Sequence, residues 1–524
     1  MASKVVQPRI NATLTSADLA VQNTAQRVLF VGPQVAAASA GTGLLSENIA
    51  NGGAEDGLYG PNSLIAGAIR AFKKINPIVM IDGIGFDDAA GTPNVFTITF
   101  GASSVATEAG ILTIVAGSEK NHSFDVPVAV GDTEDTIGAA AVTLINADLT
   151  CPLTASYTTA VLSLTADNDG AQANDLGVEV TGTVDGVTNS PGAAILVANT
   201  AAGATEPTLT GGLDVIGDRR YQGIVWIFSD LTEVMTVLNA RFNVDNKILD
   251  GVCFHWIVDT HANTLSTLGG SDYNSQSLVV FCDDAVSEAA YKGPAMNEAG
   301  WIKAAQFAAV RSLRLTDGAS ISQFLTSTES LDQFGGTALA SLPYFNTPFP
   351  NLPINPPDRG WTDIEIEQLF DAGGSMIGTN SGGDAVIAGE VVTTYLTDAA
   401  SNPDPTWQFL NSVDVMSNAR EYFVNNWRKR FAQSRLTTGS AVRGRGMVNK
   451  PIFTAYTEQL YLNLTGPNFV LGVGGEGAIV FFKENLTVVI TMSTGTITTT
   501  MEFPMVVGMR EILATIKVVF STEG

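Results

Sequence analysis

The sequence is poor in cysteine, histidine and positive charge. Its 524 residues include only three Cys and three His, which rules out a disulfide framework and leaves few groups for general acid–base catalysis. Lys and Arg number 27 against 52 Asp and Glu, for a formal net charge of -25. A general nucleic-acid binder needs a basic surface, so direct nucleic-acid binding is disfavoured. We expect a protein made in the cytoplasm with reduced thiols.

Long hydrophobic runs are also missing. No stretch approaches the roughly 18 consecutive apolar residues of a transmembrane helix, and the charges near the N-terminus are not followed by the apolar run of a secretory signal. We therefore expect no direct membrane insertion. Charged residues make up 15% and hydrophobic residues 45% of the chain, which argues against disorder. The length indicates two to four domains.

The few cations are unevenly distributed. Residues 87–212 contain fifteen acidic residues and one cation, Lys120. Residues 420–450 contain a single acid, Glu421, and eight cations: Arg420, Arg428, Lys429, Arg430, Arg435, Arg443, Arg445 and Lys450. A solvated surface explains either run, but the density of the second favours attraction to an acidic partner.

The apolar pattern on both sides of the acidic segment is typical of an α/β domain. Residues 27–32 read as a buried strand, Ser63 caps a helix that Pro77 ends, and residues 78–81 read as the next strand. The same texture returns at residue 221, with strands expected at residues 223–228, 251–258 and 277–281 and a helix at residues 231–242. This alternation predicts parallel pairing with helices on the faces of the sheet.

The acidic segment between these parts has a different texture. Short strands separated by turn residues are expected at residues 95–100, 110–115, 122–126, 155–157, 160–165 and 177–181, with one helix near residues 136–146. The pattern predicts a mostly β sandwich at residues 86–212. This insertion divides one α/β domain into residues 27–85 and 213–350.

A C-terminal α+β domain is expected at residues 351–507. Thr362 and Glu365 form a capping-box pattern, residues 391–396 and 478–482 read as strands, and residues 414–434 read as a helix with an apolar stripe. The ends of the chain, residues 1–26 and 508–524, read as arms. One side of the last strand carries alternating Ile512, Ala514, Ile516, Val518 and Phe520. That strand pairs either within its own domain or with another chain.

The motifs that suggest chemistry are weak. Residues 472–477 match G-x-G-x-x-G, but a dinucleotide fingerprint requires a helix next, and a strand is expected there. Cys253, His255, Asp259 and His261 suggest a metal, yet the second ligand pair of a zinc site is missing. We expect no catalytic residues, no cofactor and no metal.

Several short motifs together resemble contractile tail sheath proteins of bacteriophages, in particular the Mu-like branch. They are Gln26-Arg-Val-Leu-Phe-Val-Gly32, Gly57-Leu-Tyr-Gly-Pro-Asn-Ser63, Asp218-Arg-Arg-Tyr-Gln-Gly-Ile-Val225, Pro357-Asp-Arg-Gly-Trp-Thr-Asp-Ile-Glu365 and Val391-Val-Thr-Thr-Tyr395. The acidic sandwich is similar to the family's outward protrusion domain, and residues 422–435 are similar to its basic C-terminal helix.

The resemblance implies a structural virion protein. Such subunits form a helical homo-oligomer of hexameric rings around a tail tube protein, bounded by baseplate and tail terminator proteins. The assembly contracts and drives the tube through the host envelope. The resemblance assigns lacing between subunits to residues 1–26 and 508–522. It assigns contact with the tube to Arg420, Arg428, Lys429, Arg430 and Arg435. The location implied is the virion tail, assembled in the host cytoplasm.

Two other functions remain open on the sequence. One is a different virion or surface protein, such as an adhesin-like shell component whose sandwich binds glycans. The other is an α/β enzyme, which only the strand–helix–strand texture favours. A third open question is whether Cys151 is exposed and forms a disulfide with a neighbouring subunit, or is an inert thiol.

Overall fold

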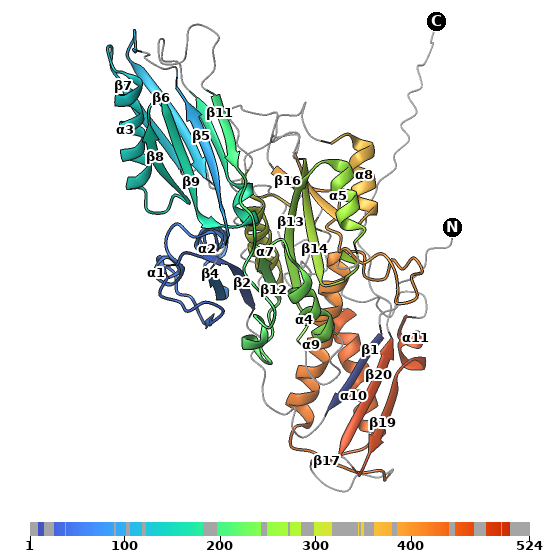
Figure 1. Cartoon of the computed structure of the whole chain (residues 1–524). Helices are drawn as coiled ribbons and strands as arrows, with labels where there is room; N and C mark the ends of the chain where they lie inside the picture. The colour runs from blue at the N-terminus through green and yellow to red at the C-terminus, as the bar shows by residue number, and fades with distance from the viewer. Residues whose placement is uncertain are drawn as a thin grey trace, which may run out of the picture.

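Three parts follow one another along an elongated molecule in the computed structural model (Figure 1). The inserted sandwich lies at one end, an α/β core in the middle, and a C-terminal module, here residues 410–502 with the strand at residues 9–14, at the other end. The structure describes residues 9–14, 26–36, 38–87, 91–100, 105–117, 122–181, 196–242, 249–270, 273–284, 298–316, 344, 347–349, 361–379, 385–439, 446–465, 478–493 and 495–502. No helix among these residues is long and apolar enough to cross a membrane.

The α/β core is built on an eight-stranded sheet. In spatial order its strands are β16 (Ala385–Ala388), β15 (Gly374–Thr379), β14 (Leu278–Asp284), β13 (Val252–Asp259), β12 (Gly223–Trp226), β2 (Arg27–Gln34), β4 (Met80–Asp87) and β3 (Leu45–Ser46). The six inner strands are parallel, as predicted, and the two edge strands are antiparallel to their neighbours. β15 and β16 lie beyond residue 350, so this sheet continues past the expected end of the α/β domain.

Helices cover both faces of the sheet, because its central strands are apolar on both sides. The helices are α1 (Ala54–Tyr59), α2 (Leu64–Ile75) and α7 (Gly300–Thr316) on one face, and α4 (Thr232–Phe242), α5 (His261–Leu268), α8 (Asp363–Asp371) and the short 3-10 turn η3 (Asp214–Ile216) on the other. Phe30 of β2 meets Phe72 of α2 edge to face, with ring centroids 5.5 Å apart. The caps expected from sequence are present: Ser63 on α2, and the Thr362–Glu365 box on α8.

The insertion contains two antiparallel sheets and one helix, which confirms the predicted β texture. One sheet has the order β10 (Gly177–Thr181), β6 (Gly110–Gly117), β7 (Ser123–Val128); the other has β11 (Leu196–Ala201), β5 (Pro93–Thr99), β9 (Val161–Asp169), β8 (Leu153–Thr158). The helix is α3 (Glu134–Ala147), and a 3-10 turn, η2 (Ala171–Asp175), follows β9. Leu112, Ile114 and Leu162 are fully buried between these elements. β11 was not expected.

The C-terminal module has its own apolar core. Its elements are α9 (Leu410–Phe431), β17 (Arg435–Leu436), β18 (Met447–Val448), α10 (Lys450–Thr465), α11 (Ala478–Glu484), β19 (Thr487–Thr491), β20 (Thr496–Glu502) and β1 (Arg9–Leu14). The apolar stripe expected on the long helix is present, since Phe423 and Trp427 are fully buried. Trp427 stacks near Phe453 of α10 and donates its indole N–H to Thr457, 3.1 Å away.

Two expected strands are not strands. Residues 478–482 begin helix α11, where Ala478 and Phe482 are buried one turn apart; a short apolar run does not distinguish the two structures. Residues 391–396 form no continuous strand, because their backbone partners lie on different segments: Thr393 donates to Gln408 and Thr394 to Leu278, the first residue of β14. The glycine motif at residues 472–477 lies outside the described residues.

Candidate functional site

The inserted sandwich covers the sheet edge at which α/β enzymes bind ligands. In open parallel sheets that site is the carboxyl edge, where the strand order reverses. Here the reversal is at β2, which has β4 on one side and β12 on the other. Asn168 of the insertion accepts the backbone N–H of Leu64, the first residue of α2, at 2.9 Å. Glu206 accepts the backbone N–H and the hydroxyl of Ser229, just after β12, at 2.8 and 2.7 Å. The helix N-terminus that could hold an anion is therefore partly occupied by the chain itself.

The residues that suggested a metal are placed in the core strand β13 and just beyond it. Cys253 and His255 are buried, and burial lowers the pKa of His255 to about 4. Asp259 is engaged by the backbone of Thr260 and the amide of Asn263. Among the described residues, no group of three His, Cys, Asp or Glu side chains is arranged to hold a metal ion.

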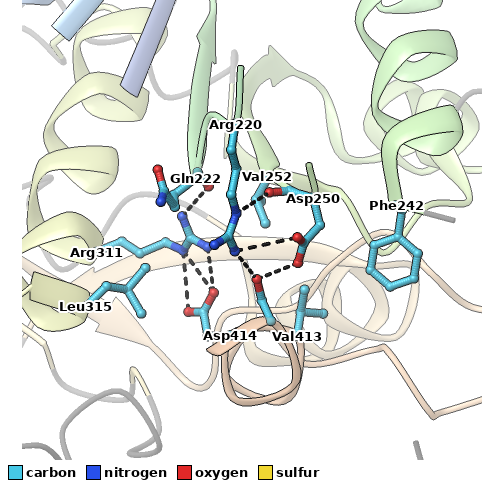
Figure 2. Close-up of a pocket in the computed structure, with 11 residues that line it drawn as sticks. Arg220, Gln222, Phe242, Asp250, Val252, Arg311, Leu315, Val413 and Asp414 are labelled. Carbon is cyan, nitrogen blue, oxygen red and sulfur yellow. Dashed lines mark hydrogen bonds and ion pairs between the residues drawn. The ribbon is translucent and has the colours of Figure 1, made fainter. Parts of the chain in front are cut away.

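A small cavity lies where α9 meets the α/β core (Figure 2). Its volume is about 10 Å³, room for roughly one water molecule, so it is no substrate pocket. Its polar lining consists of Arg220, Gln222, Asp250, Arg311, Asp414 and Ser417.

One buried ion pair closes the cavity on the α7 side. Arg311 of α7 donates from Nη2 and Nε to the carboxylate of Asp414, at 2.6 and 3.1 Å. The Asp414 carboxylate also accepts the hydroxyl of Tyr344 at 2.6 Å, and Arg311 donates to the carbonyl of Gln222 at 2.7 Å. Burial would lower the pKa of Arg311, but Asp414 outweighs it and raises that pKa. Arg311 is therefore charged.

A second cluster lies one turn further along α9. Arg220 donates to Glu421 and to the hydroxyl of Ser417, both at 2.6 Å, and Ser417 bonds to the Asp250 carboxylate. Burial would raise the pKa of Asp250, but Arg220 and Arg420 outweigh it and hold that pKa below its usual range. The Asp250 carboxyl is therefore ionised.

The five predicted tube-contact residues are not on one surface. Arg428 is 7% exposed, and Arg420 is half-buried against the carbonyl and ring of Phe242. Two of the five side chains for which contact with the tube is predicted are therefore largely covered within the subunit. Lys429, Arg430 and Arg435 are exposed.

A three-stranded sheet brings both ends of the chain into the C-terminal module. β1 pairs antiparallel with β20, from Arg9 opposite Glu502 to Leu14 opposite Ile497. β19 pairs with the other side of β20, and none of the described strands pairs with the outer edge of β19. The apolar residues of the predicted final strand, Ile512, Ala514, Ile516, Val518 and Phe520, lie outside the described residues.

Of the two possibilities left open for Cys151, the structure favours the inert thiol, because the side chain is 3% exposed. Burial raises its pKa to about 12, which leaves almost no thiolate at neutral pH. Its place in the core of the sandwich excludes it from a disulfide with another subunit while that core is folded.

The chain is similar in sequence to a known tail sheath protein. The chain is 22% identical to the Mu-like prophage FluMu tail sheath protein of Haemophilus influenzae over 450 residues, which is 84% of this chain and 83% of that protein. The resemblance to Mu-like tail sheath proteins is confirmed. No family model matches the chain. The sheath tail protein Lin1278 of Listeria innocua superposes over 94% of this chain and 95% of its own, at 9% identity and a TM-score of 0.43, which is too loose to carry an argument.

The ionic residues at the α9 junction are the part that sequence reasoning missed. Arg220 stands within a motif shared with tail sheath proteins, but nothing local pairs it with Glu421, 201 positions away. Arg311 and Asp414 are 103 positions apart. The one available signal is that Asp414 stands among the apolar residues Val413, Val415 and Met416 near the start of the helix.

Proposed function

We propose that this chain is a structural subunit of a contractile tail sheath. In this proposal it polymerises as a helical homo-oligomer of rings around a tail tube protein, and the assembly contracts to drive the tube through the host envelope. The observation that carries the proposal is the sequence similarity to a tail sheath protein across 84% of the chain. The subunit would join the virion tail after assembly in the host cytoplasm, with baseplate and tail terminator proteins at its ends.

The charge distribution supports a radial orientation. The acidic sandwich and the C-terminal module lie at opposite ends of the molecule (Figure 1). We therefore place the sandwich outside and the exposed Lys429, Arg430 and Arg435 toward the tube. Ionic contacts between exposed groups are weak and screened by salt, so they would break at little cost when the sheath contracts.

The sheet at the chain ends supports lacing by strand addition. An open strand edge accepts a strand from another chain through main-chain hydrogen bonds. Within the part of the chain that the structure describes, β19 is an edge strand of its sheet. β1 is joined to β2 by residues 15–26, which span at most about 40 Å when extended. The same pairing of β1 with β20 can therefore form within one subunit or between close neighbours. Residues 508–522 are the proposed partner for β19.

The chain is proposed not to be an enzyme and to need no cofactor. The insertion over the carboxyl edge of the sheet and the water-sized cavity support this, because neither of these two described places offers an evident substrate site. Among the residues that the structure describes, no specific contact favours the adhesin-like alternative.

Negative-stain images of the purified full-length chain test the function and the lacing together. We expect striated cylinders from the full chain, and dispersed subunits from a chain that ends at residue 507. Removal of residues 508–524 takes away the strand offered to the neighbour but leaves β19 and β20 in place. Ordered cylinders from the shortened chain would contradict lacing by this segment. Absence of any cylinder or ring from the full chain, with or without the tube protein, would contradict the sheath proposal.

A further inference from the structure

Helix α9 belongs to two parts of the molecule at once. Leu410 and Val413, near its start, are buried in the core of the α/β sheet and its helices. Phe423 and Trp427, further along, are buried in the core of the C-terminal module. The helix is unbroken over 22 residues, about 33 Å. A rotation of either part is therefore transmitted along one rigid rod.

Between its two apolar ends, α9 is held by charged groups. Asp414, Ser417 and Glu421 follow at a spacing of three and four residues, which places them on one face of the helix. This face meets α7, the segment that precedes β12 and the segment that precedes β13, as Figure 2 shows for Arg311, Arg220 and Asp250. We call these six residues the α9 lock; Arg420 adds a third cation beside Asp250.

The lock is sheltered from solvent. The side chain of Asp414 is 0% and that of Arg311 6% exposed, while Arg220 and Asp250 are 13% and 5% exposed. Buried charges are costly unless each is paired and hydrogen-bonded, and here every carboxylate has an arginine partner. A shift of α9 along a junction that stays closed would leave charges of both signs unpaired in a place with room for about one water.

Ionic contacts fix the orientation of α9 on the core more narrowly than apolar packing does. Burial of apolar area is non-directional and lets a helix slide or turn with little penalty. Arginine donating two bonds to one carboxylate fixes distance and angle. Arg311 donates two bonds to Asp414, and Arg220 donates one bond to Ser417 and one to Glu421 further along the helix. These two points of attachment define both the register and the rotation of α9 on the core.

We propose that the α9 lock makes the α/β core and the C-terminal module one rigid lever. Rotation of the core then moves the exposed basic end of α9 on a lever arm as long as the helix, and no hinge bends between the two parts. The lock is a property of the single chain; its use in contraction rests on the proposed sheath function.

Distances between spin labels on the two parts test this proposal. Ile364→Cys in α8 and Met492→Cys after β19 provide exposed sites, 69% and 50% exposed, whereas the three native cysteines are buried. Labelled full-length chain, diluted with unlabelled chain, is measured by double electron–electron resonance. We expect one narrow distance distribution, and at least a twofold broader one when Asp414→Asn and Glu421→Gln are introduced together.

A matched control removes an ion pair elsewhere in the module. Glu458 of α10 pairs with Lys483 of α11 at 3.2 Å, so Glu458→Gln removes a carboxylate without touching the junction and should leave the distribution unchanged. If the double variant does not fold, the single variant Glu421→Gln provides the test. The Glu421 side chain is 19% exposed, and its replacement leaves Asp414 paired with Arg311. A smaller broadening of the distance distribution is then expected. An unchanged distribution in a folded lock variant would overturn the proposal, whether or not the chain forms cylinders.

Discussion

Asp175 lies at the boundary between the insertion and the α/β core. It is the last residue of the η2 turn of the insertion, and its carboxyl group interacts electrostatically with Lys303 and Asp283 of the core. Burial raises the pKa of Asp175 to about 6; Lys303 opposes this rise and Asp283 adds to it. In the unfolded chain the pKa of Asp is about 3.9. The folded chain therefore binds this proton more tightly.

The sign of this shift gives a prediction. Between about pH 4 and pH 6 the folded state holds more protons at Asp175 than the unfolded state, so its contribution to stability falls as pH rises through that window. Asp175→Asn should flatten this fall and raise the melting temperature at pH 8 by about one to a few degrees. Thermal unfolding from pH 4 to pH 8 measures it, with Glu108→Gln at an exposed site of the same sandwich as control. An identical pH profile for wild type and Asp175→Asn would show that Asp175 is not a perturbed acid.

At the scale of elements, the root of the insertion depends on close backbone packing. A bridge between Thr92 and Ala204 closes the two ends of the insertion, and Gly203 lies against Gly170. A Cβ at Gly203 would stand 2.1 Å from the carbonyl oxygen of Gly170. That oxygen belongs to the backbone and cannot turn aside, so the two ends would have to separate.

Gly203→Ala should therefore lower the free energy of unfolding by about 1–3 kcal/mol. Gly57→Ala is the matched control, because Gly57 lies in helix α1 with nothing within 4 Å of the added carbon; it should be neutral or slightly stabilising. Urea unfolding followed by circular dichroism compares the two. Equal effects would mean that the root tolerates the extra atom and is not held by this contact.

At the scale of the whole molecule, charges of opposite sign are far apart. The acidic sandwich lies at one end of the molecule and the exposed end of α9 lies toward the other (Figure 1). Lys429 and Arg430 remain available to a partner, while Arg428 is enclosed. A test of the proposed tube contact should change only the exposed pair, because reversal of a buried charge would disturb folding.

Lys429→Glu with Arg430→Glu should weaken assembly on the tube protein more than assembly of the sheath chain alone, because only the first depends on attraction to an acidic surface. Co-sedimentation with tubes, at low salt and at 0.5 M salt, measures both. Lys483→Glu, an exposed cation of the same module outside α9, is the control and should change little. Equal losses with and without tubes would argue that these residues serve contacts between sheath subunits instead.

The sequence by itself determined the local elements and the charge split. Buried strands, capped helices and the stripe of α9 each follow from a periodicity that a few neighbouring residues carry, and the parallel sheet follows from their alternation. The same periodicity failed at residues 478–482, where five apolar residues suit a helix as well as a strand. It also failed at Thr393 and Thr394, whose backbone partners, Gln408 and Leu278, lie on two different segments.

Only the tertiary structure decided which distant groups meet. Arg311 bonds to Asp414 across 103 positions of the chain. Arg220 bonds to Glu421 across 201 positions, and Asn168 bonds to the start of α2 across 104. The burial of Cys151 and Arg428 has the same origin. A side chain's neighbours along the chain report its local conformation, whereas its partners in space depend on how the whole chain closes on itself. The tail sheath proposal draws on both, since similarity along the sequence supports the function and the α9 lock suggests how one subunit acts as a unit.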